Sequence, residues 1–317
     1  MDLHDNSPFR VHVVAAAIFD DQDNVLVALR PLSAHQGGLW EFPGGKTELG
    51  EGAEAALARE IEEELGIKIT TARPLIRIPY DYPDKKVLLD VWRVERFLGK
   101  PHGREGQPIA WLNPKDIDKR KFPLANLPII TAVQLPSTYL ITPEPTNNEV
   151  FFTRLERALQ DGARLVQLRV KTKGQPLVPI MKRAAELCYQ YDATLLVNAE
   201  LRWAQEGLAD GVHLTSRQLM ALDERPLSMD KWVAASCHDK AELSHACRIG
   251  VDFAVVGPVQ PTTSHPNAPV LGWDGFASLA AQATIPVYAL GGMATTDLSQ
   301  AWRHGGQGIA AITGLWR

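Results

Sequence analysis

Three glutamates, Glu60, Glu63 and Glu64, are the residues whose types and spacing are best suited to chemistry. In an α-helix, side chains at positions i, i+3 and i+4 are neighbours, so these carboxylates would share one face. Like charges held this close destabilise a helix unless a cation lies between them. Oxygen ligands favour Mg²⁺, with Mn²⁺ as a second option, so the spacing predicts a divalent metal site.

The three glutamates belong to a longer pattern of fixed positions. From Gly45 to Ile67 the sequence follows G-x5-E-x7-R-E-I-x-E-E-x-G-I, a glycine-bounded loop before a helix. An acidic run alone is more often a solvated helix face, but this many matched positions resemble the signature of the Nudix hydrolases. The resemblance implies an α/β/α sandwich with a mixed sheet and a Mg²⁺-dependent hydrolase. The metal ligands it implies are Glu60, Glu63, Glu64 and the backbone carbonyl of Gly44.

Two further catalytic residues are implied by the same resemblance. Arg59 is expected to orient a carboxylate, although a surface ion pair would also explain it. Glu60 is either a metal ligand or the general base. Glu105 lies in the loop Gly-Arg-Glu-Gly-Gln at residues 103–107. In the MutT branch of the family, a glutamate in a matching Glu-Gly-Gln context joins the metal site.

The similarity to the MutT branch extends to segments that would bind the nucleotide. These are Trp-Glu-Phe-Pro-Gly-Gly-Lys at residues 40–46 and Phe-Pro-Leu-Ala-Asn at residues 122–126. Arg30 and His35 fall at the spacing of substrate-contacting positions in that branch, although ordinary surface positions would also explain both. A turn would also explain Asn126. The nucleotide-binding residues implied by the resemblance are Arg30, His35, Glu41, Phe42, Pro43, Gly44 and Asn126.

An asparagine is chemically suited to recognise an oxidised guanine, the base that the MutT resemblance assigns to Asn126. Its amide carries a donor and an acceptor together. Guanine presents two acceptors, O6 and N7, on this edge, whereas N7 of 8-oxoguanine carries a hydrogen. One amide then satisfies both positions, and ordinary guanine would leave an unpaired polar edge that costs about 1–3 kcal/mol. The resemblance therefore implies hydrolysis of 8-oxo-dGTP to 8-oxo-dGMP and pyrophosphate.

The composition limits the other function classes. A net charge of −4 predicts no bulk attraction to nucleic acid or membranes. No apolar run approaches the ~18 residues of a spanning helix, and the polar segment from Met1 to Arg10 has no signal-peptide core. The three cysteines, Cys188, Cys237 and Cys247, lack C-x-x-C spacing and are expected to be buried thiols. We expect a cytoplasmic enzyme acting on a small molecule.

A length of 317 residues fits two domains, and the pattern changes near residues 132–137. We expect a Nudix domain over residues 1–133 and a TIM barrel over residues 137–317. In the first, apolar runs at 11–19 and 25–29 flank a polar turn and predict a hairpin, and a helix is expected over about Ala53–Leu65 with Gly66 as its stop. Further strands are predicted at 87–97 and 109–112.

The second part alternates strands with helices, which predicts a compact (β/α)₈ barrel. Helices are expected at 151–160, 178–189, 240–249, 276–282 and 298–303. The expected strands are 139–142, 165–170, 194–198, 211–214, 232–236, 253–256, 287–290 and 309–312.

This barrel resembles thiamine phosphate synthase and its thiazole tautomerase relatives. Gln-Leu-Arg-Val-Lys at residues 167–171 matches their Q-x-R-x-K, and glycine pairs match later strand ends. Such barrels place their active site at the carboxyl ends of the strands, and glycine lets backbone N–H groups approach a phosphate. The ligand-binding residues implied by the resemblance are Gln167, Arg169, Lys171, Asn198, Gly291, Gly292 and Thr313.

The departures from the synthase pattern are at its charged positions. Two aspartates that bind Mg²⁺-pyrophosphate correspond to Ala199 and Gln218, and a loop lysine corresponds to His265. We therefore expect a degenerate synthase that still binds a thiazole or thiamine phosphate. An alternative places both domains in thiamine metabolism, with the hydrolase acting on pyrophosphates of that pathway and the barrel as a sensor or enzyme.

Overall fold

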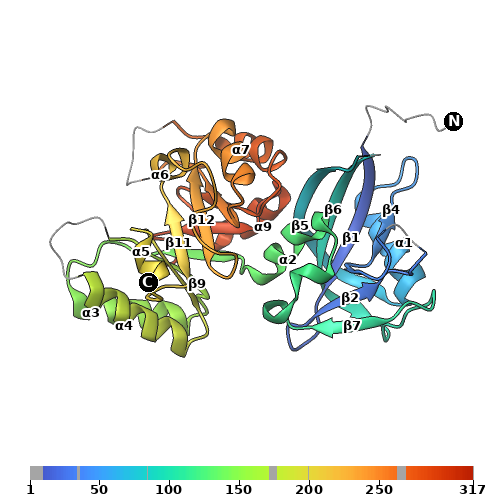
Figure 1. The fold of residues 1–317 in the computed structure, drawn as a ribbon, viewed down its shortest axis with the longest axis horizontal. Helices are drawn as coiled ribbons and strands as arrows, with labels where there is room; N and C mark the ends of the chain where they lie inside the picture. Colours follow the sequence, from blue (N-terminus) through green and yellow to red (C-terminus); the bar gives the residue numbers. More distant parts are fainter. Residues whose placement is uncertain are drawn as a thin grey trace. The chain divides into compact units, whose positions relative to one another are not determined.

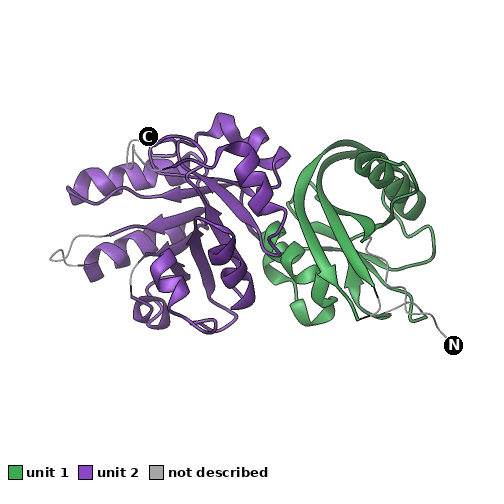
Figure 2. Cartoon of the chain, turned by 90° about the horizontal axis from the view of Figure 1, so that it is seen from above, with its two compact units in different colours: residues 1–134 green, residues 135–317 purple. Residues whose placement is uncertain are grey.

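The computed structural model describes residues 10–33, 36–83, 85–170, 177–198, 200–262 and 269–316. The chain divides into two compact units, Met1–Gln134 and Leu135–Arg317, coloured green and purple in Figure 2. Each unit has its own buried apolar clusters.

Two sheets form the first unit (Figure 1). The larger sheet is mixed and has the strand order β4-β1-β6-β5, with β1 (Val11–Ile18) parallel to β6 (Lys86–Leu98). Strand β4 (Gly44–Lys46) runs antiparallel to β1, and β5 (Lys68–Asp81) runs antiparallel to β6. The smaller antiparallel sheet has the order β3-β2-β7, from β3 (Trp40–Glu41), β2 (Val25–Leu29) and β7 (Ile109–Leu112).

A helix covers each face of the mixed sheet. Side chains alternate along a strand, so Val14 and Ala16 pack with helix α1 (Ala53–Leu65) on one face. Ala15 and Ala17 lie in the other cluster, which contains helix α2 (Leu127–Gln134). This arrangement confirms the predicted α/β/α sandwich with a mixed sheet.

The predicted hairpin of the first two strands is wrong. Strand β1 has both edges occupied, by β4 and by β6, so it cannot form a ladder with β2. Only one antiparallel bridge, Phe19 to Val25, joins the two segments. The turn is held instead by Asp20, whose carboxylate accepts from the N–H groups of Gln22 and Asn24, and the chain leaves it for the second sheet.

Strand β5 and helix α2 were not predicted, because each contains proline, which usually interrupts strands and helices. Pro74 and Pro79 lie inside β5, which is tolerated because β5 is an edge strand with a register shift between Pro74 and Ile76. Pro128 lies in the first turn of α2, where the missing N–H has no helical partner to lose.

Helix α1 has the predicted bounds, Ala53–Leu65. It ends at Gly66, which is left-handed at φ 66° and donates its N–H to the carbonyl of Glu62. Its buried side chains are Ala56, Leu57, Ile61 and Leu65, packed on β1. Glu60, Glu63 and Glu64 lie on the remaining surface of the helix.

The second unit is a closed barrel of eight parallel strands, which confirms the predicted (β/α)₈ fold. Aromatic side chains fill its centre, where the rings of Tyr139 and Phe253 pack edge to face with their centroids 5.3 Å apart. The strands are β8 (Thr138–Ile141), β9 (Leu165–Leu168), β10 (Thr194–Val197), β11 (Gly211–Leu214), β12 (Trp232–Cys237), β13 (Phe253–Val256), β14 (Val287–Leu290) and β15 (Gly308–Ala311).

Helices cover the outside of the barrel, and their apolar faces form one continuous cluster with the strands. The two shortest, α5 and α6, were not predicted. Cys188 and Cys237 are buried free thiols, as expected, whereas Cys247 is a free thiol that is only half-buried, contrary to the prediction. The helices are α3 (Asn148–Gln160), α4 (Leu177–Gln190), α5 (Arg202–Gln205), α6 (Ser216–Met220), α7 (Lys240–Arg248), α8 (Gly272–Ala280) and α9 (Leu298–Arg303). Short 3₁₀ turns are η1 (Pro114–Asp116), η2 (Lys119–Lys121), η3 (Leu124–Asn126) and η4 (Thr295–Asp297).

Candidate functional site

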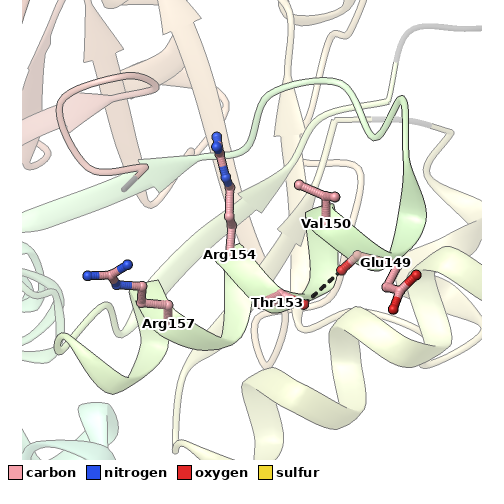
Figure 3. Close-up of a pocket in the computed structure, with 5 residues that line it drawn as sticks. All are labelled: Glu149, Val150, Thr153, Arg154 and Arg157. Carbon is pink, nitrogen blue, oxygen red and sulfur yellow. Dashed lines mark hydrogen bonds between the residues drawn. The ribbon is translucent and has the colours of Figure 1, made fainter.

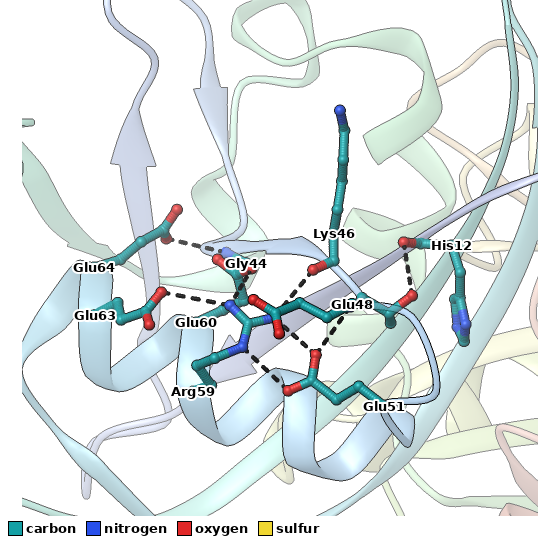
Figure 4. Close-up of polar contacts among 10 residues, drawn as sticks. His12, Gly44, Lys46, Glu48, Glu51, Arg59, Glu60, Glu63 and Glu64 are labelled. Atoms are coloured by element: carbon teal, nitrogen blue, oxygen red, sulfur yellow. Dashed lines mark hydrogen bonds and ion pairs between the residues drawn. The ribbon is translucent and has the colours of Figure 1, made fainter.

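Arg59 is the centre of the polar contacts on α1 (Figure 4). Its Nε and Nη2 donate to the two carboxylate oxygens of Glu51 at 3.1 and 2.8 Å, a bidentate pair. Its Nη1 donates to Glu60 at 2.8 Å and reaches Glu63 at 3.4 Å, and Nη2 also donates to the Lys46 carbonyl at 3.2 Å. One guanidinium therefore ties the loop before the helix to two of the three glutamates.

The Glu51 carboxylate completes this anchor. It also accepts from the Glu48 N–H at 3.0 Å, which closes the turn that leads into α1. Hydrogen bonds from Arg59 and Glu48 lower the pKa of Glu51, and hydrogen bonds to Glu51 and Glu60 raise the pKa of Arg59. The sequence motif contains Glu51, but our predictions gave it no role; its fixed spacing from Arg59 was the available signal.

Gly45 allows the Glu60 carboxylate to lie against the backbone of β4. A Cβ at Gly45 would lie 2.2 Å from Glu60 Oε2, closer than any van der Waals contact. Glycine at this position lets the Glu60 carboxylate lie against the backbone, which accounts for its place in the pattern.

Glu64 is half-buried, as is Glu60, whereas Glu63 is exposed. Glu64 points to Gly44, whose N–H donates to Glu64 Oε2 at 3.1 Å (Figure 4). Burial raises the pKa of Glu64 to about 8, the Gly44 hydrogen bond opposes this, and the charges of Glu41, Glu105 and Glu60 raise it further. Three carboxylates from three segments of the chain thus lie within electrostatic reach of Glu64.

The loop at residues 102–107 holds Glu105 beside Glu64 by capping α1. The backbone N–H of Arg104 and the Gln107 amide donate to the Glu64 carbonyl at 2.9 and 3.2 Å. His102 N–H donates to the Leu65 carbonyl at 3.1 Å. These bonds satisfy carbonyls that a helix end leaves without partners, so the loop is fixed to the end of the helix that carries Glu64.

Arg30 and Glu41 form an ion pair between β3 and the segment after β2. Burial raises the pKa of Glu41, while the charge and hydrogen bond of Arg30 oppose the rise. The charge of Glu41 also raises the pKa of Glu64. A predicted nucleotide-binding residue and a predicted metal ligand therefore influence each other electrostatically. His35 lies outside the described residues.

The two predicted nucleotide-binding segments meet through their aromatic residues. The rings of Phe42 and Phe122 lie 6.0 Å apart, and both are buried in the cluster that contains α2. Pro43 accepts from the Ala16 N–H at 2.8 Å, which fixes this segment on β1. Asn126 ends η3 half-buried, and its side chain makes no hydrogen bond to another described residue.

In the barrel, Gln167 and Asn198 lie on the side lined by β9 to β12. Gln167 donates to the Tyr139 hydroxyl at 3.3 Å, and Asn198 donates to the His213 carbonyl at 2.8 Å. The backbone N–H of Arg169 donates to the Thr142 hydroxyl at 3.1 Å. Lys171 lies outside the described residues.

The predicted glycines Gly291 and Gly292 follow β14 with φ of 102° and 67°. A Cβ on Gly291 would lie 2.7 Å from Pro258, so other side chains are excluded by space as well as by conformation. Thr313 is exposed in the turn after β15. A Cβ on Gly314 would lie 2.1 Å from the Met293 carbonyl, which shows that these two strand-end segments lie in contact.

Gln218, which stands at an aspartate position of the synthase pattern, is engaged in its own helix. Its side-chain oxygen accepts from the N–H and the hydroxyl of Thr215, both at 2.9 Å, in a capping box at the start of α6. Ala199, at the other aspartate position, lies outside the described residues.

Comparisons with known proteins agree with both units. Residues 138–315, more than half of the chain, match the family described as thiamine monophosphate synthase, and residues 14–132 match the NUDIX domain. The 8-oxo-dGTP diphosphatase of Escherichia coli (strain K12) is 34% identical over 125 residues, which is 39% of this chain and 97% of that protein. The putative thiamine-phosphate synthase 2 of Aquifex aeolicus (strain VF5) is 33% identical over 182 residues, 57% of this chain and 98% of that protein. This chain belongs to the Nudix and thiamine monophosphate synthase families.

The N-terminal unit is therefore a Nudix hydrolase domain, and the C-terminal unit is a barrel of the synthase family. A solved structure from a study of MutT of Aliivibrio salmonicida and Vibrio cholerae is 42% identical, covers 39% of this chain and 97% of that chain, and has a TM-score of 0.35. No helix in the described part of the chain is long and apolar enough to span a membrane.

Nudix hydrolases generally use a divalent metal, and the charge of this site fits one. Among the described residues, no group of three or more His, Cys, Asp or Glu side chains lies close enough together to hold a metal ion. The reason is visible in the contacts: Arg59 engages Glu60 and Glu63, while Glu64 turns to Gly44. Burial and the neighbouring carboxylates raise the pKa of Glu64, and a bound cation would favour its charged form instead. The carboxylate oxygens present are the hard ligands that Mg²⁺ prefers.

A shallow hollow on α3 contains none of the predicted site residues (Figure 3). Its volume is about 450 Å³, and it is lined by Glu149, Val150, Thr153, Arg154 and Arg157. All five lining residues are exposed and lie on α3, so the hollow is a feature of the helix surface.

Proposed function

We propose that the Nudix unit hydrolyses 8-oxo-dGTP to 8-oxo-dGMP and pyrophosphate in a Mg²⁺-dependent reaction. The observation that carries this proposal is the half-buried Glu64, which has Glu41, Glu60 and Glu105 within electrostatic reach. Removal of the oxidised nucleotide would keep it from being incorporated opposite adenine. We also propose that the enzyme acts in the cytoplasm.

The metal would be held by five residues: the carboxylates of Glu60, Glu63, Glu64 and Glu105 and the backbone carbonyl of Gly44. A divalent ion bound there would neutralise phosphate charge and lower the pKa of a water molecule. Arg59 positions Glu60 and Glu63 through the contacts described above, with Glu51 fixing Arg59 in turn. Glu60 remains open to either of two roles, metal ligand or general base.

We propose that Asn126 selects the oxidised guanine base. Arg30 and the segment 40–46, which contains Phe42, would contact the same nucleotide. The Asn126 amide has no partner among the described residues, so its donor and acceptor are available to a ligand. The Phe42–Phe122 contact supports this position because it joins the two segments that carry the predicted base-side residues.

For the barrel we propose binding of a thiazole or thiamine phosphate without synthase activity. The engagement of Gln218 in a helix cap supports this, because that side chain is not free to replace an aspartate that binds Mg²⁺-pyrophosphate. The strand-end glycines are suited to a phosphate.

A second candidate function follows from the fusion itself. The synthase-family match lies in the same chain as the Nudix domain, which favours a hydrolase that removes pyrophosphates of the thiamine pathway. Asn126 favours the oxidised purine instead, because the MutT resemblance assigns an asparagine in this sequence context to the oxidised base.

A substrate panel separates the two. The full chain with Mg²⁺ is offered 8-oxo-dGTP, dGTP and hydroxymethylpyrimidine pyrophosphate, and kcat/KM is compared. We expect 8-oxo-dGTP to be preferred, and Asn126→Ala to reduce the preference over dGTP about tenfold, the factor of one hydrogen bond to a buried edge. Leu98→Ala, at an exposed leucine on β6 outside the predicted nucleotide-binding segments, is the control and should leave the ratio unchanged. Preference for the pyrimidine compound would overturn the proposal.

A further inference from the structure

The side chain of Gln107 bridges the backbones of two predicted metal ligands. Its Nε2 donates to the Glu64 carbonyl at 3.2 Å, and its Oε1 accepts from the Glu105 N–H at 3.0 Å. A carbonyl can only accept and a backbone N–H can only donate, so these two partners fix which way the amide points. One planar group therefore joins the last turn of α1 to the loop that carries Glu105.

Glu105 lies in a tight turn that leaves its own N–H without a partner inside the turn. The Gly106 N–H donates to the Gly103 carbonyl at 3.1 Å, which closes the turn and places Glu105 at its third position. In such a turn only the fourth residue donates to the first. The N–H of Glu105 is satisfied instead by Gln107 Oε1, so this side chain completes the hydrogen bonding of the turn.

The backbone beside Gln107 is fixed independently of its side chain. The carbonyl of the next residue, Pro108, accepts from the Leu29 N–H at 2.9 Å, and β7 follows directly, paired with β2. On its other side, Gln107 packs so closely on Gly103 that a Cβ there would lie 1.9 Å from the Gln107 carbonyl. The bridging amide is thus attached to a segment held by a sheet.

Helix capping alone does not distinguish Gln107 from its neighbour Arg104. Arg104 Nη1 donates to the Glu62 carbonyl at 3.0 Å, so both side chains satisfy carbonyls that the end of α1 leaves without partners. Only the Gln107 amide also holds the backbone of Glu105. The charge of Glu105 raises the pKa of Glu64, so the two carboxylates lie within electrostatic reach.

We propose that Gln107 is a positioning residue that holds Glu105 beside Glu64 for the binding of a divalent cation. This role rests on the metal site of the proposed function. A loop carboxylate that is not held must lose conformational freedom when the ion binds, and the Gln107 bridge removes much of that cost beforehand. Outer partners of metal ligands typically change metal affinity about 10–100-fold when they are lost.

The bridge is measured first in the metal-free full-length protein, by hydrogen exchange of the Glu105 N–H in NMR spectra. Gln107→Met keeps the length of the side chain and removes both hydrogen bonds. We expect this N–H to exchange about fivefold faster in Gln107→Met, the factor of one hydrogen bond of about 1 kcal/mol. Arg104→Met removes the other side-chain cap and should leave the rate unchanged. Equal rates in the wild type and Gln107→Met would overturn the bridge.

The effect on the cation is measured by calorimetry of the full chain with Mg²⁺. We expect Gln107→Met to weaken Mg²⁺ binding about tenfold and Arg104→Met not to weaken it, because a lost positive charge does not oppose a cation. In a Glu105→Gln background, Gln107→Met should add little, since the ligand that it positions is already gone. Equal weakening in Gln107→Met and Arg104→Met would reduce Gln107 to a helix cap and overturn the positioning role.

Failure of this role and failure of the proposed function give different results. A wild type that binds no Mg²⁺ overturns the metal site and the positioning role with it. Weakened binding in Glu105→Gln together with unchanged binding in Gln107→Met overturns the positioning role alone. Unchanged binding in Glu105→Gln removes Glu105 from the ligands and overturns the positioning role, while the site on α1 stands.

Discussion

Glu64→Gln tests the electrostatics of the Nudix site in the metal-free protein. Burial and three neighbouring carboxylates raise the pKa of Glu64 from 4.5 to about 8. Between these values the unfolded chain has released a proton that the folded protein keeps, so stability falls as the pH rises through this window. This loss of stability is absent below the pKa of Glu64 in the unfolded chain, and it stops growing above the pKa of Glu64 in the folded protein.

The magnitude at pH 7 follows from the distance to the unfolded pKa. That distance is about 2.5 pH units, and each unit corresponds to about 1.4 kcal/mol, so the charge costs about 3 kcal/mol. Glutamine carries no charge and keeps an oxygen that can accept from the Gly44 N–H. We therefore expect Glu64→Gln to stabilise the metal-free Nudix unit by about 2–3 kcal/mol at pH 7, and by less than about 1 kcal/mol at pH 5.

Denaturant unfolding in EDTA measures this, with the transitions of the two units followed separately because a two-unit chain need not unfold in one step. Glu62→Gln, an exposed glutamate on the same helix, is the matched control and should change little. With Mg²⁺ present the order should reverse, since the wild type gains stability by binding the ion, and Glu64→Gln should lose hydrolysis of every substrate. Equal stability of variant and wild type at pH 7, or a gain that persists at pH 5, would refute the reasoning.

Three further predictions concern individual positions. Gly45→Ala places a Cβ 2.2 Å from Glu60 Oε2, so kcat should fall at least about tenfold while circular dichroism stays unchanged. Gly103→Ala places a Cβ 1.9 Å from the Gln107 carbonyl, and the displaced loop should weaken Mg²⁺ affinity in calorimetry; unaltered affinity would separate Glu105 from the metal. Burial lowers the pKa of His213 to about 3, so the barrel should lose stability as the pH falls below 6.5, by about 2 kcal/mol at pH 5, and His213→Gln should flatten this dependence.

The catalytic helix was predictable because its signals are local. The bounds of α1 and its stop at Gly66 depend on residues within one stretch of chain, and so does the spacing of Glu60, Glu63 and Glu64. The barrel was equally predictable, since its strands alternate with helices at regular intervals and each strand is short and buried on both faces. Local propensity and pattern carry such elements without knowledge of their partners.

Elements that depend on partners were harder to predict. The hairpin prediction failed because β1 has neighbours on both edges that come from distant parts of the chain. Strand β5 is tolerable with two prolines only because it lies at a sheet edge, a fact that no local pattern contains.

The sequence by itself determined which residue types this protein has for metal and phosphate chemistry, and at what spacing along helix and strands. Only the tertiary structure decided which of them meet. It brought Glu105 to Glu64 by capping α1 with a distant loop, and it made Glu51 the partner of Arg59. In the barrel it joined Tyr139, His213 and Ser236 from three strands. The physical reason is that local bonding fixes helix and strand, whereas side-chain contacts between distant segments depend on how the whole core packs.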